Sequence, residues 1–216
     1  MANFTTKFLL LDGEYGGVKS RGVSNQDFSI LELAITVTDI NLDVYETLVL
    51  KIKPDDDKYI VSAEGLAANK INLVHHDKVA ITHGKAKELL HNFLKKHSDG
   101  GRVKLFPLGK GIGKDIQFIF NQKLISEHYW REFISDQIID FGGIIMLLKL
   151  LGVYPQTVKK STGKMSNSLE ALAEDLNIST DSLHEAKGDV DLYIKVCKHL
   201  FSLFKKHLPQ AKLPTK

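Results

Sequence analysis

The chain has 216 residues and a formal net charge of +3, with 43% hydrophobic and 25% charged residues. This composition is ordinary for a globular protein, and the small net charge excludes a polycation. A local basic surface that binds a polyanionic partner is still possible. The length suits one large α/β domain better than two small ones.

The ends of the chain and its cysteine content indicate an intracellular, cytoplasmic protein. Cys197 is the single cysteine, so no internal disulfide can form. The N-terminal sequence reaches acidic residues after a very short apolar run, which is unlike a signal peptide. No stretch approaches the length of a membrane span.

The first third of the chain predicts three strands in an antiparallel meander. Residues 7–11 form a short apolar run, and the segments 29–38 and 46–52 are rich in β-branched residues. Short turn-forming segments separate them.

Helices and strands then alternate. Helical periodicity predicts helices at 62–69, 85–96, 115–124, 143–151, 168–176 and 186–206, and two more strands are expected at 103–108 and 137–140. This order predicts an α/β fold with a mixed five-stranded sheet, antiparallel on one side, parallel on the other and flanked by helices. Residues 1–206 are expected to form a single domain, followed by a basic, mobile tail at 207–216.

The helix predicted at 143–151 carries an apolar stripe. Ile144, Leu147, Leu148 and Leu151 recur at helical spacing, and this pattern predicts that all four are buried in the core.

The first candidate for chemistry is Asp12-Gly13-Glu14, which follows a run of three leucines. Residues two apart in a strand project to the same face, so both carboxylates would point at one spot, while Gly13 leaves room on the other face. Adjacent like charges repel, and a bound cation relieves the repulsion. Taken alone, the pattern is more typical of an acidic, solvated strand end.

The second candidate is Asp115, in a glycine-rich stretch. A phosphate-binding P-loop needs four residues between its glycines, then Lys and a Ser or Thr. Here three residues separate Gly109 from Gly113, and Asp115 follows Lys114, so a P-loop is excluded. What remains is an acid at the start of a helix, where it could equally be a helix cap.

The third candidate pairs His184 with Asp189 at the entry to the last predicted helix. Five helical residues turn the direction by about 140°, so the two side chains meet only if His184 lies in the preceding loop or first turn. An imidazole titrates near neutral pH, which suits a general base. An ordinary surface histidine is the alternative.

Together, four acids and a histidine outline a two-metal site. Divalent ions about 4 Å apart would clamp a phosphodiester while a histidine deprotonates the attacking water. Carboxylate ligands without thiolates favour Mg²⁺ or Mn²⁺ over Zn²⁺.

The order D-x-E, a later Asp opening a helix, and H-x-A-x-x-D resembles the DEDDh family of 3′–5′ exonucleases, which includes RNase T, oligoribonuclease and the proofreading exonucleases. The similarity runs from about Lys7 to about Lys198. The tyrosine-using branch would carry Tyr four residues before Asp189, and Glu185 stands there, so the histidine branch is indicated.

The resemblance implies a ribonuclease H-like fold and a metal-dependent 3′–5′ exonuclease with two Mg²⁺ or Mn²⁺ ions, acting on single-stranded 3′ ends. Asp12, Glu14 and Asp189 would hold one ion; Asp12 would bridge to the second, which Asp115 would support through water. His184 would be the general base.

The resemblance also implies a substrate pocket, where this chain departs from its relatives. Gly16 and Gly17 would let the terminal nucleotide lie against the backbone, with Tyr15 stacking or wedging beside it. Many members have His-Asn where this chain has Lys110-Gly111, and Thr or Met-Thr in place of Tyr15-Gly16. Lys110 could contact phosphate instead.

These departures leave a second hypothesis open. It is a nucleic-acid-binding module on the same fold, with weakened catalysis, that acts as a subunit or recruiter. The sequence does not separate DNA from RNA, because that choice depends on contacts to the 2′-hydroxyl. It leaves the oligomeric state open as well, a homodimer included.

Overall fold

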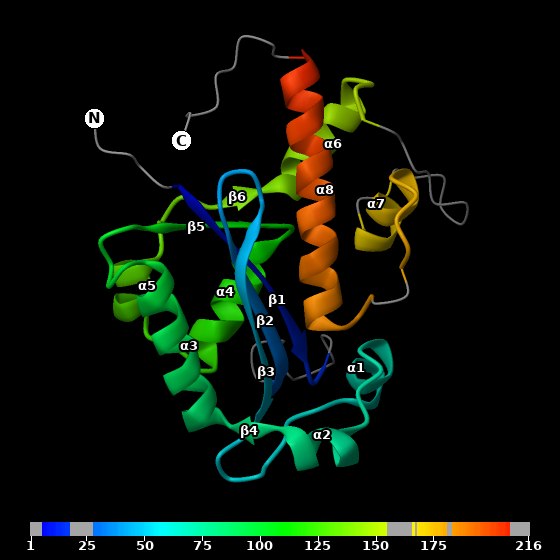
Figure 1. Cartoon of the computed structure of the whole chain (residues 1–216). Coiled ribbons are helices and arrows are strands. Elements are labelled where there is room, and N and C mark those ends of the chain that lie inside the picture. Colours follow the sequence, from blue (N-terminus) through cyan, green and yellow to red (C-terminus); the bar gives the residue numbers. More distant parts are fainter. Residues whose placement is uncertain (1–5, 18–27, 155–165, 167, 181–182, 208–216) are drawn as a thin grey trace.

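A mixed sheet with helices on both faces forms the centre of the protein (Figure 1). The computed structural model describes residues 6–17, 28–154, 166, 168–180 and 183–207. Residues 208–216 of the predicted tail lie outside the described residues.

The sheet has six strands in the order β4-β3-β2-β1-β5-β6. β1, β2 and β3 pair antiparallel, whereas β5 joins β1, β6 joins β5 and β4 joins β3 in parallel. This confirms the predicted mixed sheet and adds the two-residue β4 to the five strands expected. The strands are β1 Lys7–Tyr15, β2 Ile30–Thr38, β3 Val44–Lys53, β4 Ile81–Thr82, β5 Leu105–Gly109 and β6 Ile139–Asp140.

All six predicted helices are present, with ends shifted by a few residues. The helices are α1 Ala63–Ala68, α2 Leu73–Val79, α3 His83–His97, α4 Ile112–Asn121, α5 Glu127–Phe133, α6 Phe141–Leu150, α7 Leu169–Asp175 and α8 Ala186–His207. The two that the sequence did not reveal, α2 and α5, have seven residues each. Among the described helices, none is both long and apolar enough to cross a membrane.

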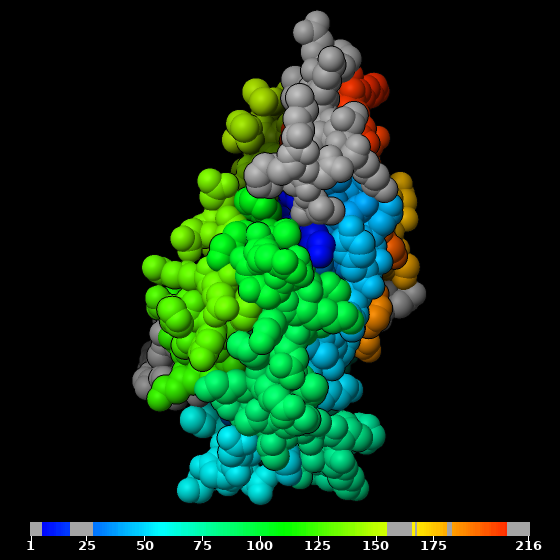
Figure 2. All heavy atoms as spheres, turned by 60° about the vertical axis from the view of Figure 1, so that its left-hand side comes forward, coloured from blue at the N-terminus to red at the C-terminus, as the bar shows by residue number. Residues whose placement is uncertain are grey.

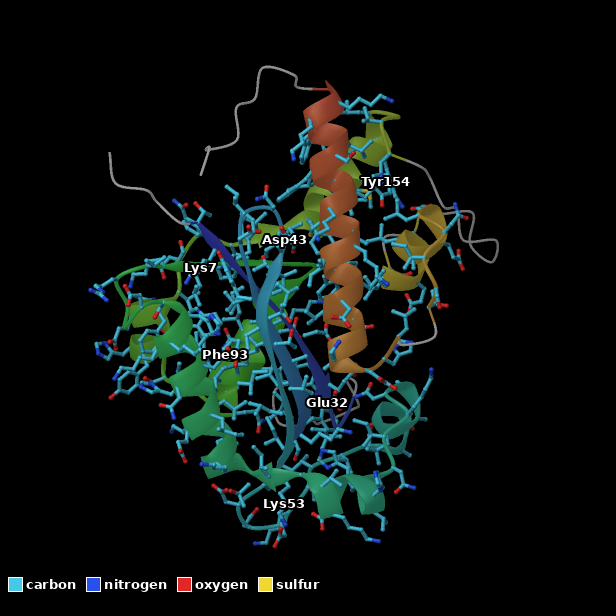
Figure 3. The ribbon with its side chains drawn as sticks, in the orientation of Figure 1. Lys7, Glu32, Asp43, Lys53, Phe93 and Tyr154 are labelled. Carbon is cyan, nitrogen blue, oxygen red and sulfur yellow. The ribbon has the colours of Figure 1, made fainter. Side chains whose placement is uncertain are left out.

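Alternate side chains of β1 enter two separate cores. Leu9 and Leu11 pack with side chains of α3, α4 and α5, and Phe8 and Leu10 pack with side chains of α6, α7 and α8. Figure 2 shows the first helical layer as green spheres, with blue strand residues beside it. In Figure 3, Phe93 marks the α3 side and Tyr154 lies beside α8. Leu9, Leu10 and Leu11 are fully buried, so β1 is held from both faces.

The predicted apolar stripe of α6 is only partly buried. Leu148 packs against the second core. The prediction was wrong for Leu147 and Leu151, whose exposed fractions are 57% and 66%. The helix instead turns Phe141, Ile145 and Lys149 inward, since residues four apart lie on one face.

An ion pair explains why α6 buries the face that carries Lys149. The ammonium of Lys149 lies 2.8 Å from Oδ2 of Asp175 at the end of α7, and both side chains are buried. It also donates to the carbonyl of Ser166 at 2.8 Å. A buried charge requires such partners, so a lysine decides which side of this apolar helix faces the core.

Candidate metal centre and active site

β1 brings Asp12 and Glu14 to one place. Both lie on the strand face that Phe8 and Leu10 share, toward α8. Their exposed fractions are 9% and 8%, so these are buried acids and not a solvated strand end. A carboxylate oxygen of Asp12 lies within 4.8 Å of one of Glu14, so the prediction that the pair converges on one spot is confirmed in geometry.

The first turn of α8 adds Asp189 to this pair. One carboxylate oxygen from each of Asp12, Glu14 and Asp189 lies within 4.8 Å of the other two. Three carboxylate oxygens at this spacing suit a hard divalent cation. These are the three residues expected to hold the first ion.

Asp115 lies next to this triple, on α4. Gly111, with φ of 67°, is the N-cap of α4, so the helix begins three residues earlier than predicted and Asp115 is not its cap. Its Oδ1 accepts a hydrogen bond of 2.8 Å from the Tyr15 hydroxyl. The charge of Asp115 helps raise the pKa values of Asp12 and Glu14, which agrees with its place beside them.

His184 lies in the loop before α8, as a shared site with Asp189 requires. Its φ of 67° is left-handed, and its backbone N–H donates to Oδ1 of Asp189 at 3.3 Å. Its Nε2 lies 3.5 Å from Oε1 of Glu170 on α7. Glu170 was not predicted as part of the site. It faces the histidine as an anion that can orient an imidazole and stabilise its protonated form.

The carboxylates destabilise one another as anions. Burial raises the pKa of Asp12 well above its usual range, and the charges of Asp115 and Asp189 raise it further. Burial, followed by the charge of Asp189, raises the pKa of Glu14 to about 8. Burial raises the pKa values of Asp115 and Asp189 to about 6. A divalent cation would reverse this penalty, so the donor set fits a metal in chemistry as well as in spacing.

Tyr193 contacts this cluster, although the sequence did not predict it as part of the site. Its hydroxyl donates to Oδ1 of Asp12 at 2.7 Å from one turn beyond Asp189 on α8. The signal available in the sequence is the spacing of four residues from Asp189, which puts both side chains on one helix face.

Tyr15 points toward α4. Its ring stacks on Phe118 with 3.8 Å between centroids, and its hydroxyl binds Asp115. The ring is partly buried against the first core. The expected contact of Tyr15 with a nucleotide stays a prediction, and the contact that the structure contains is with a carboxylate.

The glycine pair after Tyr15 is closely packed by protein. A Cβ on Gly16 would lie 2.6 Å from the carbonyl oxygen of Ile60, and one on Gly17 would lie 2.3 Å from the ring of Phe28. These contacts account for both glycines without a ligand, so their nucleotide contact stays a prediction.

Lys110 is half-buried, between β5 and α4. Its positive charge contributes to lowering the pKa values of Asp189 and Glu170.

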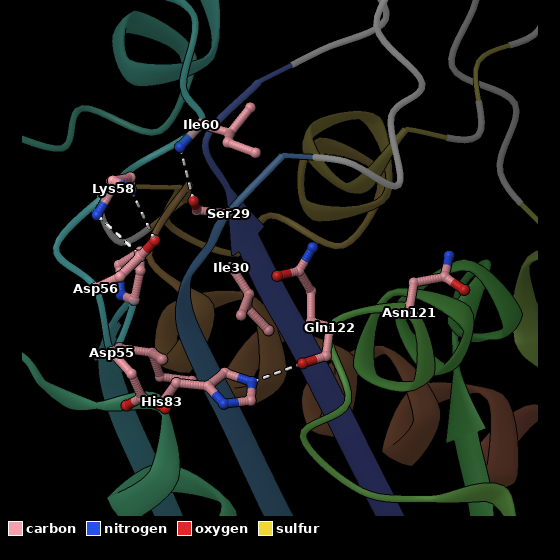
Figure 4. A pocket seen from close by; sticks show the side chains of 11 residues that line it. Ser29, Ile30, Asp55, Asp56, Lys58, Ile60, His83, Asn121 and Gln122 are labelled. Carbon is pink, nitrogen blue, oxygen red and sulfur yellow. Dashed lines mark hydrogen bonds and ion pairs between the residues drawn. The ribbon is translucent and has the colours of Figure 1, made fainter.

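A cleft of about 390 Å³ leads away from the carboxylates. Glu14 and His184 line it together with two lysines, Lys51 and Lys70. A larger hollow of about 730 Å³ lies between Ser29, the turn after β3 and the end of α4 (Figure 4). None of the four site acids lines that hollow, so the smaller cleft is the candidate path for a substrate.

Comparison with known proteins adds evidence on the fold. No protein-family model matches the chain, and no curated sequence matches it. E. coli exonuclease I in complex with a dT13 oligonucleotide superposes with a TM-score of 0.75 at 17% identity, covering 95% of this chain and 43% of that one. The same enzyme with a dA16 oligonucleotide superposes with a TM-score of 0.74 at 19% identity, covering 95% of this chain and 42% of that one. Its zinc-bound complex with single-stranded DNA superposes with a TM-score of 0.72 at 18% identity, covering 95% of this chain and 41% of that one.

The present chain spans less than half the length of these structures. At such low identity the likeness is one of architecture, and it agrees with the fold that the resemblance to DEDDh exonucleases implies. The chain therefore has a ribonuclease H-like fold, which it shares with the E. coli exonuclease I structures.

Proposed function

We propose that the protein is a metal-dependent 3′–5′ exonuclease that hydrolyses phosphodiester bonds at the 3′ end of single-stranded nucleic acid. One observation carries the proposal: within an exonuclease fold, the oxygens of Asp12, Glu14 and Asp189 come within 4.8 Å of one another, beside Asp115 and His184. The order of the acids along the chain follows the DEDDh pattern.

Asp12, Glu14 and Asp189 would hold one Mg²⁺ or Mn²⁺ ion, and Asp12 with Asp115 would serve a second. Bound ions of this kind stabilise negative charge on a phosphate and activate water. Buried carboxylates with raised pKa values support this assignment, because a cation lowers the free energy of their ionised forms.

His184 would remove the proton from the attacking water. Its backbone is tied to Asp189, so the imidazole starts from a fixed point beside the acids. Glu170 would stabilise the protonated ring, in the way that a carboxylate orients a catalytic histidine. Lys110 would neutralise a phosphate of the strand.

Single strands are the proposed substrate because the matching exonuclease I structures contain dT13, dA16 and single-stranded DNA. Lys51 and Lys70 along the cleft supply positive charge for a phosphate backbone. DNA and RNA both fit this description.

The second hypothesis is a binding module with weakened turnover. Lys110-Gly111 supports it, because it departs from the family pattern beside the site. All four acids and His184 are present and adjacent, which favours the enzyme.

The test uses single-stranded DNA and RNA oligomers of one sequence, each labelled at either the 5′ or the 3′ end. With Mn²⁺, a 3′–5′ exonuclease releases a 3′ label at once and shortens a 5′-labelled strand stepwise. EDTA or Asp12→Ala should abolish both signals. Binding without shortening would favour the module, and full activity in EDTA would exclude the metal mechanism.

A further inference from the structure

Two tyrosines, Tyr193 buried and Tyr15 partly buried, each bind one carboxylate of the candidate metal centre. The Tyr193 hydroxyl donates to Oδ1 of Asp12 at 2.7 Å, and the Tyr15 hydroxyl donates to Oδ1 of Asp115 at 2.8 Å. The two bonds come from opposite sides of the sheet, since Tyr193 belongs to the second core and Tyr15 packs against the first.

The direction of these hydrogen bonds matters for a metal site. A protonated phenol donates to an ionised carboxylate and so favours the charged form that a cation needs. Both tyrosine hydroxyls donate, and the Oδ1 atoms of Asp12 and Asp115 accept.

Both rings are held in place by aromatic contacts. Tyr15 stacks on Phe118 at 3.8 Å, and Tyr193 meets Phe141 edge to face at 5.5 Å between centroids. A side chain that is packed in this way presents its hydroxyl in a fixed direction. Each tyrosine can therefore fix the rotation of the carboxylate that it binds.

Gly13 is part of the same arrangement. A Cβ at position 13 would lie 2.5 Å from the Tyr15 hydroxyl oxygen and 2.8 Å from Cζ of its ring. The absence of a side chain on Gly13 leaves room for the phenol to lie over this position, on the same face of β1, and to reach Asp115. This gives Gly13 and Tyr15 one shared function in the sequence Asp12-Gly13-Glu14-Tyr15.

We propose that Tyr15 and Tyr193 are positioning residues that engage one oxygen of Asp115 and of Asp12 and leave the other oxygen of each directed at the metal. The inference rests on the proposed function for its relevance to hydrolysis. The metal affinity that it concerns can be measured without substrate.

The test is calorimetric titration of Mn²⁺ into the full chain and into Tyr193→Phe and Tyr15→Phe. Groups that orient metal ligands typically change affinity by about 10–100-fold when removed, and we expect a loss in this range for each variant. Tyr154→Phe is the matched control, because Tyr154 is a buried tyrosine whose hydroxyl has no hydrogen-bond partner among the described residues. It should bind Mn²⁺ as the parent does.

Gly13→Ala provides a second perturbation that keeps the phenol but displaces it. It should weaken Mn²⁺ binding, and combining it with Tyr15→Phe should cost less than the product of the two separate losses. Circular dichroism and thermal unfolding in EDTA verify that each variant is folded. Fully multiplicative losses would overturn the shared function of Gly13 and Tyr15.

The outcomes separate this inference from the proposed function. Parental Mn²⁺ affinity in both folded Phe variants overturns the positioning function and leaves the exonuclease proposal intact. A parent protein that binds no Mn²⁺ overturns the metal centre and this inference with it. Equal losses in Tyr154→Phe would show that a general effect of removing a buried hydroxyl is responsible, and would likewise overturn the inference.

Discussion

Replacing Asp189 by asparagine should stabilise the metal-free protein at pH 8, although it removes a proposed metal ligand. The side chain keeps its shape, and an amide oxygen can still accept the His184 backbone N–H. What disappears is a negative charge beside Asp12 and Glu14.

The magnitude follows from the pKa of Asp189, about 6 in the folded protein against an ordinary value of about 3.9. The folded state binds more protons than the unfolded state in this range, so its stability falls as pH rises from about 4 to above 6. Two pKa units correspond to about 3 kcal/mol. Solvent screening at this partly exposed carboxyl reduces the expected gain to about 1–2 kcal/mol. That is a rise of about 2–8 °C in Tm for a chain of this size.

The assay is thermal unfolding in EDTA and in Mn²⁺, at pH 5 and pH 8. In EDTA the gain should be largest at pH 8 and about half as large at pH 5, which lies midway between the ordinary pKa of about 3.9 and the folded pKa of about 6. In Mn²⁺ the parent should have the higher Tm, because the ion stabilises the parent through a ligand that Asp189→Asn lacks. Asp191→Asn is the control, since Asp191 pairs with Lys187 on the same helix, away from the acids, and should give no gain. A gain of equal size at both pH values, or none at pH 8, would refute the electrostatic reasoning.

Three further changes test other parts of the site and fold. His184→Ala should lower kcat by about 10²–10⁴-fold with Mn²⁺ affinity retained, as measured by strand hydrolysis and titration. Glu170→Gln should lower kcat less, and should have no further effect in a protein that already carries His184→Ala; an added loss would contradict its action through the histidine. Lys149→Met removes the ammonium that pairs with Asp175 and should lower the free energy of unfolding in urea by about 3–5 kcal/mol.

The sequence predicts those parts of the molecule whose pattern repeats or whose spacing is fixed. Strand alternation places Asp12 and Glu14 on one face. The five-residue spacing of His184 and Asp189 requires His184 to lie in the loop before α8 or in its first turn if both are to reach one site. The helices α2 and α5 escape prediction because four of the seven residues in each are polar or charged, which leaves too few apolar residues for a clear helical periodicity.

The contacts that the sequence misses are single residues joined across long separations. Tyr193 reaches Asp12 from 181 positions away, and no local motif marks such a pair. The same limit applies to α6. Its leucines predict a buried stripe, but the ion pair of Lys149 with a distant aspartate determines which side faces inward.

The burial and spacing of the acids favour a site that binds a cation over a surface that binds nucleic acid without one. β1 is covered on both faces, and its three leucines are fully buried, so Asp12 and Glu14 cannot move away from Asp189 without disturbing the core. Held in this way without an ion, the carboxylates lower stability, and amides of the same shape would fold better at neutral pH. Single-stranded nucleic acid is itself anionic, and its binding gains nothing from buried negative charge. A divalent cation bound by these acids would offset this electrostatic cost, because it stabilises their ionised forms.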